Sequence, residues 1–254
     1  MELSRSQSLT ESSKPFKTID EVGIIIAAQN LTPTMMSEDF LRFSGIVPKD
    51  WELSQQPVLN PANAQLNYSN GVSINAQPRT ITWNEALSNK KLEDVVIPEI
   101  VIKYIEKLPH AEYLGMSFNS KMLVPFPQNS EIVRQYITGR LLGSGSWKNI
   151  GKAPLQAGLN LMYLLEHCQL TINVAEARLQ QPKKEPIAAI LFSGNFNYNI
   201  AQKLSAEAKI ERLKQSISFW QSDLMNFRDI VFNKFLNVAE SSGKNQEESV
   251  FPSL

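Results

Sequence analysis

The feature that most restricts how this chain can fold is an amphipathic helical stripe in residues 205–236. Apolar side chains recur there at every third or fourth position: Ile210, Leu213, Ile217, Trp220, Leu224, Phe227, Val231 and Phe235. This spacing stacks side chains along one side of an α-helix, and no glycine or proline interrupts the segment. At 1.5 Å per residue the predicted helix is about 45 Å long. It needs a broad apolar surface to cover, either a sheet of this chain or a second subunit.

The stripe therefore has two interpretations. Most such stripes pack into the core of their own chain. Alternatively, part of the stripe is shared with another subunit or with a client segment, because it is wide, long and close to the end of the chain. On this second interpretation the candidate partner-binding residues are Trp220, Phe227, Val231 and Phe235.

The first half of the chain is predicted to combine short helices with antiparallel strands. Residues 22–29 (VGIIIAAQ) form a short apolar run typical of a buried strand, and Ser37 is the predicted N-cap of a short helix. The pair Asn70-Gly71 has alternating apolar and polar residues on both sides, which predicts a β-hairpin with a type I′ turn. We expect the surrounding segment to form an antiparallel meander with one wet and one dry face.

The second half of the chain shows a similar mixture. Helices are expected at residues 98–108 and 130–142, and extended segments at 113–127, 155–165, 169–177 and 187–198. A polar loop at 180–185 separates the last two strands. The predicted class is therefore α+β, with one or more antiparallel β-sheets, helices on one face and a long C-terminal helix.

The domain organisation follows from the same pattern. We divide the chain into a disordered N-terminal tail (1–17), an α+β first half (18–142), a Gly/Ser/Lys loop (143–153), a three-stranded unit with the long helix (154–238) and a C-terminal tail (239–254).

Charge and cysteine content restrict the class of protein. Lys plus Arg and Asp plus Glu both number 25, so the formal net charge is +0, whereas nucleic-acid binders usually carry a basic excess. Cys168 is the only cysteine, which excludes an intrachain disulfide and favours a reducing, cytoplasmic setting. No apolar run approaches the roughly 18 residues that a membrane helix needs. We expect a cytoplasmic protein without a membrane segment, metal or cofactor.

The loop at residues 143–153 (GSGSWKNIGKA) is the most prominent candidate for a ligand site. A phosphate-binding loop needs four residues between its glycine and Gly-Lys, followed by Ser or Thr. Here five residues separate Gly145 from Gly151, and Ala153 replaces the hydroxyl residue. The motif fails, so a flexible surface loop is expected, in which Lys148 or Lys152 could still contact an anion.

His167 and Cys168 are adjacent, which raises the question of a Cys–His catalytic dyad. If both lie on a strand, neighbouring side chains point to opposite faces and cannot share a proton. A buried cysteine acting as a small apolar side chain is the expected role of Cys168. We therefore predict no catalytic residues from this pair.

The order of predicted elements resembles the SecB-type fold, in which a four-stranded antiparallel meander is backed by a long C-terminal helix. The resemblance covers residues 155–236, with residues 50–142 as a second, decorated copy. It rests on the order of elements and carries over no individual residue. It implies a non-enzymatic, oligomeric protein-binding module that exposes an apolar groove to extended segments.

Three functional hypotheses follow. The first is a cytoplasmic protein-binding or assembly factor, chaperone-like, whose partner is another protein or a second copy of the chain. The second is an enzyme whose site is assembled only in the fold, near residues 143–152. The third is weak nucleic-acid binding through basic residues, namely Lys148, Lys152, Arg178, Lys183 and Lys184.

Overall fold

The computed structural model describes residues 18–87, 90–127, 130–181 and 183–237. The two predicted tails, 1–17 and 239–254, lie outside the described residues. All nine strands of the described chain belong to one antiparallel sheet, in the order β2-β3-β4-β5-β1-β6-β9-β8-β7. The strands are β1 (Ile19–Ala28), β2 (Val58–Leu59), β3 (Ala64–Asn67), β4 (Val72–Gln77), β5 (Thr80–Ala86), β6 (Tyr113–Pro125), β7 (Gly158–Leu164), β8 (Gln169–Gln181) and β9 (Lys184–Asn199).

The central strands β1 and β6 join two antiparallel units into this sheet. β1 pairs with β5 at the end of the meander β2–β5, and it pairs with β6 on its other side. β6 in turn pairs with β9, which leads to β8 and β7. The meander β2–β5 and the three-stranded unit β7–β9 therefore form the two ends of one continuous sheet.

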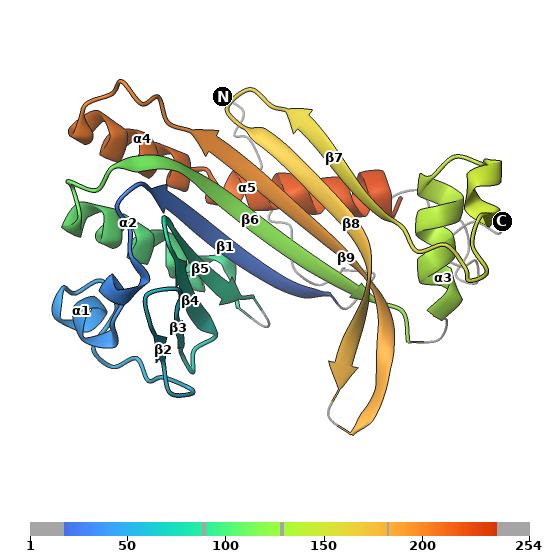
Figure 1. Ribbon diagram of the computed structural model, residues 1–254, viewed down its shortest axis with the longest axis horizontal. Helices are drawn as coiled ribbons and strands as arrows, with labels where there is room; N and C mark the ends of the chain where they lie inside the picture. The colour runs from blue at the N-terminus through green and yellow to red at the C-terminus, as the bar shows by residue number, and fades with distance from the viewer. Residues whose placement is uncertain (1–17, 88–89, 128–129, 182, 238–254) are drawn as a thin grey trace, which may run out of the picture.

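The helices α2, α4 and α5 cover one face of the sheet. In Figure 1 the strands β8 and β9 pass in front of α5, so the uncovered face is turned toward the viewer. This arrangement confirms the α+β class with helices on one face. The helical elements are η2 (Pro33–Met35), α1 (Glu38–Phe43), η3 (Leu92–Asp94), α2 (Ile97–Lys107), α3 (Ser130–Gln135), η4 (Tyr136–Leu141), η5 (Ser146–Asn149), α4 (Ala206–Ser218), α5 (Trp220–Asp229) and η6 (Ile230–Phe235).

The long C-terminal helix is present and consists of α4, α5 and η6 in succession. Ser205 caps its start, since its hydroxyl accepts a hydrogen bond from the Ala208 amide at 3.2 Å. The regular α-helix is interrupted at Phe219, although the backbone there keeps helical angles of −78° and −5°. The helix ends in a π-helical turn. A similar π-helical turn, η4, replaces the second half of the predicted helix 130–142.

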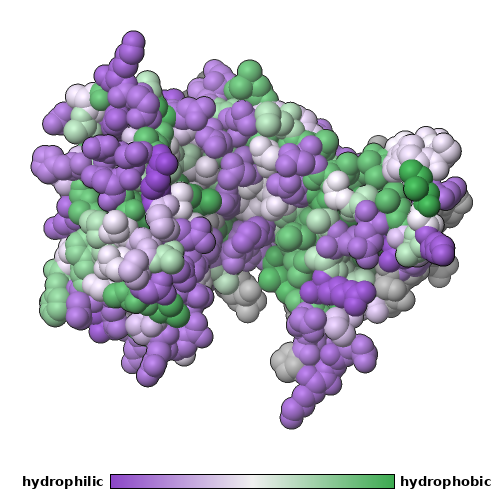
Figure 2. All heavy atoms as spheres, in the orientation of Figure 1, coloured by the Kyte–Doolittle hydropathy of each residue, from purple (hydrophilic) through white to green (hydrophobic). Residues whose placement is uncertain are grey.

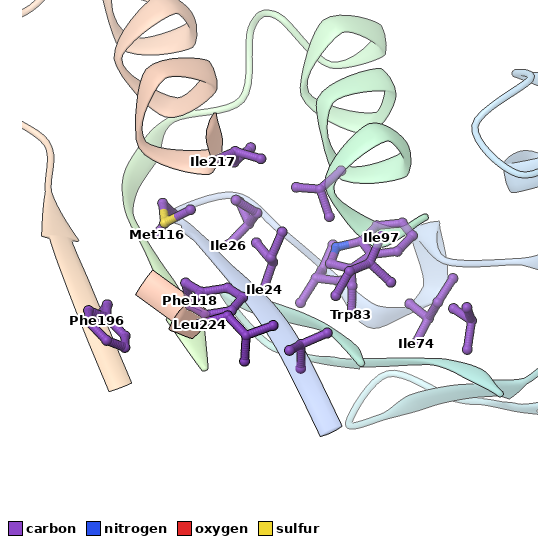
Figure 3. Packing of buried hydrophobic residues seen from close by; sticks show 14 of the residues in the cluster. Ile24, Ile26, Ile74, Trp83, Ile97, Met116, Phe118, Phe196, Ile217 and Leu224 are labelled. Carbon is purple, nitrogen blue, oxygen red and sulfur yellow. The ribbon is translucent and has the colours of Figure 1, made fainter. Parts of the chain in front are cut away.

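The core lies between the sheet and these helices. β1 alternates strictly over its second half, so that Ile24 and Ile26 are fully buried on the covered face. Figure 3 shows them beside Trp83 of β5 and Phe118 of β6, with apolar residues of the helices around them. The contributing helix residues labelled there are Ile97 of α2, Ile217 of α4 and Leu224 of α5. An ion pair between Arg228 and Asp20, 3.0 Å apart, also joins α5 to β1.

Two turns differ from the sequence prediction. The Asn70-Gly71 hairpin exists, but only Gly71 has a positive φ, of 86°, so the turn is not type I′. Tyr68 and Val72 close a three-residue loop instead, in which the glycine takes the left-handed position. The predicted polar loop 180–185 consists largely of strand ends, because β8 continues to Gln181 and β9 begins at Lys184. The polar residues of this segment thus lie at the end of the β8–β9 hairpin, which extends beyond the neighbouring strands β6 and β7.

Candidate protein-binding surface

The four predicted partner-binding residues of the long helix face the sheet of their own chain. Phe227 and Val231 are fully buried in the core, and Trp220 and Phe235 are partly buried against it. The Phe227 ring lies directly on the backbone of Gly194 in β9, where an added Cβ would be 2.5 Å from a ring carbon. Most of the stripe is thus used for packing within the chain, as most such stripes are.

In the loop at residues 143–153, the two candidate lysines lie near the surface but do not form a common anion-binding site. Lys148 donates a hydrogen bond from its ammonium to the Thr138 carbonyl, and it lies 5.6 Å from the centroid of the Trp147 ring. Lys152 is exposed in the irregular segment that follows η5. The ammonium of Lys148 therefore has a partner inside the chain, which reduces its availability for an anion.

His167 lies in the tight turn between β7 and β8, and Cys168 closes this turn just before β8, so the pair is not on a strand. The Leu165 amide donates to the Cys168 carbonyl at 2.9 Å, so the turn consists of Glu166 and His167. The His167 ring stacks on Phe219, with centroids 5.4 Å apart and planes 4° apart. The ring of Tyr198 also lies nearly parallel to Phe219, at 6.1 Å. The turn is thereby held against the junction of α4 and α5.

A small polar cluster lies beneath this turn. The Tyr198 hydroxyl donates a hydrogen bond of 2.6 Å to the carboxylate of Asp223, which is only 8% exposed. Burial raises the pKa of Asp223 to about 6, against the lowering effects of the Tyr198 hydrogen bond and of His167. Burial, followed by the charge of Asp223, also raises the pKa of the Cys168 thiol.

The chemistry of this cluster is structural rather than nucleophilic. A raised pKa keeps the Cys168 thiol protonated near neutral pH, and a thiol reacts far more slowly than a thiolate. The pKa of Tyr198 is also raised, first by burial and then by its bond to Asp223. Cys168 stands out in the sequence as the only cysteine, whereas Tyr198 and Asp223 have no local signal because they are distant in sequence and meet only through packing of α5 on β9.

The uncovered face of the sheet is mostly polar. Strand registers place one row of small or amide side chains across it: Ser73, Asn84, Gly23, Asn119, Asn195 and Thr171. The amides of Asn195 and Asn119 are hydrogen-bonded at 2.5 Å. Figure 2 shows hydrophilic residues across the middle of this face and hydrophobic ones gathered toward the α3 end. The predicted meander with one wet and one dry face is thus confirmed.

The two edges of the sheet differ sharply. β2 forms one edge, and it has only two residues, with Pro57 immediately before it and Pro61 shortly after. Short strands and prolines are common means of protecting an edge against pairing with other chains. β7 forms the other edge, and its seven residues (GLNLMYL) contain no proline and no charge. Of the two terminal strands of the described sheet, β7 therefore offers the longer edge for a further strand.

Apolar side chains are concentrated at this open edge. Met162 is 68% exposed, Tyr163 42% and Leu164 90%. Leu159 and Leu161, which point to the helix-covered face, are only partly buried, although their β8 neighbours Val174 and Ile172 are fully buried. The apolar layer between the sheet and the helices therefore reaches β7, where its outermost side chains are not fully covered. Such an uncharged, apolar edge strand is a typical site of strand pairing with another polypeptide.

The backbone of β7 is divided between two directions. In an antiparallel strand pair, residues whose backbone groups bond to the partner strand alternate with residues whose backbone groups point away from it. The hydrogen bond from Leu165 to Cys168 shows which β7 residues bond to β8. Leu159, Leu161 and Tyr163 therefore pair with β8. The backbone groups of the other four residues, Gly158, Asn160, Met162 and Leu164, point away from β8 into the open edge.

Other kinds of site find little support in the part of the chain that the structure describes. No group of three or more His, Cys, Asp or Glu residues there is arranged to hold a metal ion. None of its helices is both long enough and apolar enough to cross a membrane. The chain matches no protein-family model, and no curated protein sequence matches it.

Proposed function

We propose that this chain is a non-enzymatic protein-binding module that joins another polypeptide by strand addition at β7. The observation that carries the proposal is the long, uncharged β7 edge with four outward-pointing backbone positions. Main-chain hydrogen bonds supply affinity in this mode of recognition, and alternating side-chain contacts supply selectivity. The partly buried Leu159 and Leu161 provide such contacts on the helix-covered side.

The similarity to a SecB-type arrangement supports a binding role. A sheet backed by a long C-terminal helix leaves its edges and one face for other chains, while the helix stabilises the sheet. We extend the proposal to an assembly or chaperone-like role. We place this role in the cytoplasm, because a chain with a single cysteine suits a reducing compartment. The alternative of an enzyme centred on residues 143–152 stays a prediction, and the bond from Lys148 to Thr138 weakens it.

A titration with an unfolded polypeptide tests the proposal. Fluorescently labelled, reduced and carboxymethylated lysozyme is the probe, and fluorescence anisotropy reports its binding. The decisive variant is Met162→Pro, because proline removes an outward N–H without removing a bond to β8. The matched control, Met162→Ala, keeps this N–H.

In dilute protein, where the β7 edge is unpaired, we expect the wild type and the alanine variant to bind the probe and the proline variant to bind at least tenfold more weakly. Circular dichroism and thermal melting check that all three proteins are folded. Equal binding by the alanine and proline variants would show that β7 is not the binding surface. Absence of binding by all three would contradict a role in capturing unfolded segments, although it would leave pairing with a folded partner to be tested by mass.

A further inference from the structure

We infer that the polypeptide which covers β7 is a second copy of this chain, whose own β7 pairs antiparallel with the first around Leu161. This inference rests on the proposed function, since it names the partner for the same edge. A two-fold axis perpendicular to the sheet would join two nine-stranded sheets into one. The helices of both copies would then lie on the same face.

The direction of the backbone groups fits this register. A two-fold axis at Leu161 places Asn160 opposite Met162 of the second copy, and Gly158 opposite Leu164 of the second copy. These are the four residues whose N–H and C=O groups point outward. Every outward position of one strand therefore meets an outward position of the other, so the whole of β7 is paired and no open strand position is left over.

The side chains fit the same register. On the helix-covered face Leu161 meets Leu161 of the second copy, and Leu159 meets Tyr163 of the second copy. Leu161 stands at a non-hydrogen-bonded position, where opposing side chains of an antiparallel pair are closest. These residues adjoin the buried Val174, Ile172 and Leu170 of β8, so the apolar layer of each copy would continue into the other.

Charge does not oppose this pairing. Residues 153–165 contain no charged side chain, so none meets its own copy across the axis. The first charged residue beyond β7 is Glu166, which the register places opposite Gln156 of the second copy. A two-fold pairing brings identical segments together, and like charges directly opposite one another destabilise a sheet. An edge without charge is therefore compatible with self-association, and the net charge of +0 adds no overall repulsion.

The first test is the mass of the full chain in solution, measured by light scattering across a concentration series. We expect the wild type and Met162→Ala to reach twice the chain mass of 28.6 kDa as concentration rises. Met162→Pro is expected to remain a folded monomer. Monomeric wild type at all concentrations would overturn the inference, and so would a proline variant that still dimerises.

The second test measures the register by crosslinking and does not depend on the proline variant folding. In a Cys168→Ser background, Leu161→Cys places two thiols opposite each other across the axis. We expect mild oxidation to convert this variant into a covalent dimer. Leu164→Cys, whose thiol has no counterpart nearby in this register, is expected to crosslink at least tenfold more slowly. Equal rates for the two variants would refute pairing around Leu161.

Failure of this inference can be told apart from failure of the proposed function. A wild type that is monomeric but binds carboxymethylated lysozyme through β7 would leave the function standing and overturn the second copy as partner. A wild type that is monomeric and does not bind the polypeptide would contradict both. A dimer that survives Met162→Pro would place self-association elsewhere and leave the lysozyme titration to decide the function.

Discussion

At the scale of single residues, Asp223 is a carboxyl group whose ionisation the fold disfavours. The residue is 8% exposed, and its neighbours in the cluster are Tyr198, Cys168 and His167. Burial raises its pKa from the ordinary 3.8 to about 6. Below pH 3.8 the group is protonated in both states and contributes nothing. As pH rises toward 6 the unfolded state loses its proton more readily, so stability falls and then stays lower.

The variant Asp223→Asn should therefore be more stable than the wild type near pH 7, by about 2 kcal/mol. The asparagine oxygen can still accept the Tyr198 hydrogen bond. Urea denaturation at several pH values measures the difference, which should vanish below about pH 4. The control is Asp229→Asn, an exposed position on the same helix, which should change little. If Asp223→Asn were more stable than the wild type by the same amount at every pH, ionisation of Asp223 would not be the cause of the difference.

Glu85 is a buried carboxylate with the opposite, stabilising role. Its side chain is completely buried and accepts hydrogen bonds from the amides of Val96 and Ile97, at 2.9 Å and 3.1 Å. Its other oxygen is 2.8 Å from the ammonium of Lys90. The carboxylate thus binds the amino end of α2, where backbone N–H groups have no helical partner and the helix dipole favours negative charge.

We expect Glu85→Ala to lower the free energy of unfolding by about 3 kcal/mol, because it leaves buried donors unsatisfied. Glu85→Gln keeps one acceptor oxygen and should lose less. Chemical denaturation gives both values. Glu99→Ala, which alters an exposed residue of the same helix, is the control and should lie close to the wild type. A small effect of Glu85→Ala would mean that water replaces the carboxylate.

At the scale of elements, the contact between α5 and β9 depends on one glycine. The ring of Phe227 occupies the space above Gly194, at distances of 2.5 Å and 2.8 Å from where a Cβ would stand. Because this ring is fully buried, it has little room to move. The C-terminal helix can therefore approach the sheet closely only where β9 lacks a side chain on the covered face.

The variant Gly194→Ala is expected to destabilise the protein by about 2 kcal/mol through overpacking. Adding Phe227→Leu should recover part of this loss, and a double-mutant cycle by urea denaturation measures the coupling. Gly115→Ala in β6 is a matched control, since its added Cβ would lie 3.4 Å from the nearest atom, an ordinary contact. Strictly additive effects at positions 194 and 227 would argue against the close contact.

At the scale of the whole molecule, the sheet has one protected edge and one open edge. The short strand β2 lies at one end and the apolar strand β7 at the other. The central strands β1 and β6 each have strand neighbours on both sides, so their backbone groups pair within the sheet in both directions. Association through β7 would close this open edge, while the short β2 edge and the projecting end of the β8–β9 hairpin would stay unpaired.

Amide hydrogen exchange followed by NMR should show this asymmetry residue by residue. In dilute protein we expect alternating protection along β7, with slow exchange at Leu159, Leu161 and Tyr163 and fast exchange at Asn160 and Met162. At high concentration the fast amides should become protected as the second copy pairs. In Met162→Pro the Asn160 amide should stay fast at every concentration. Uniform protection in dilute wild type would contradict an open edge.

Much of this fold follows from local sequence patterns. The period of three to four in residues 205–236 predicts the long helix, because side-chain direction in a helix depends only on nearby residues. Ser37 and Gly45 mark the ends of α1 in the same way, through a side-chain cap at 3.2 Å and a positive φ of 69°. The sequence by itself therefore determined the class, most elements and the wet and dry faces of their strands.

Only the tertiary structure decided which strands are neighbours and which edge stays open. The run GLNLMYL of β7 has the composition of an interior strand, and nothing local shows that β8 lies on only one side of it. The Tyr198–Asp223 pair and the packing of Phe227 on Gly194 likewise join residues far apart in sequence. Such contacts depend on long-range pairing, whose outcome is set by the packing of the whole chain and not by local conformational preference.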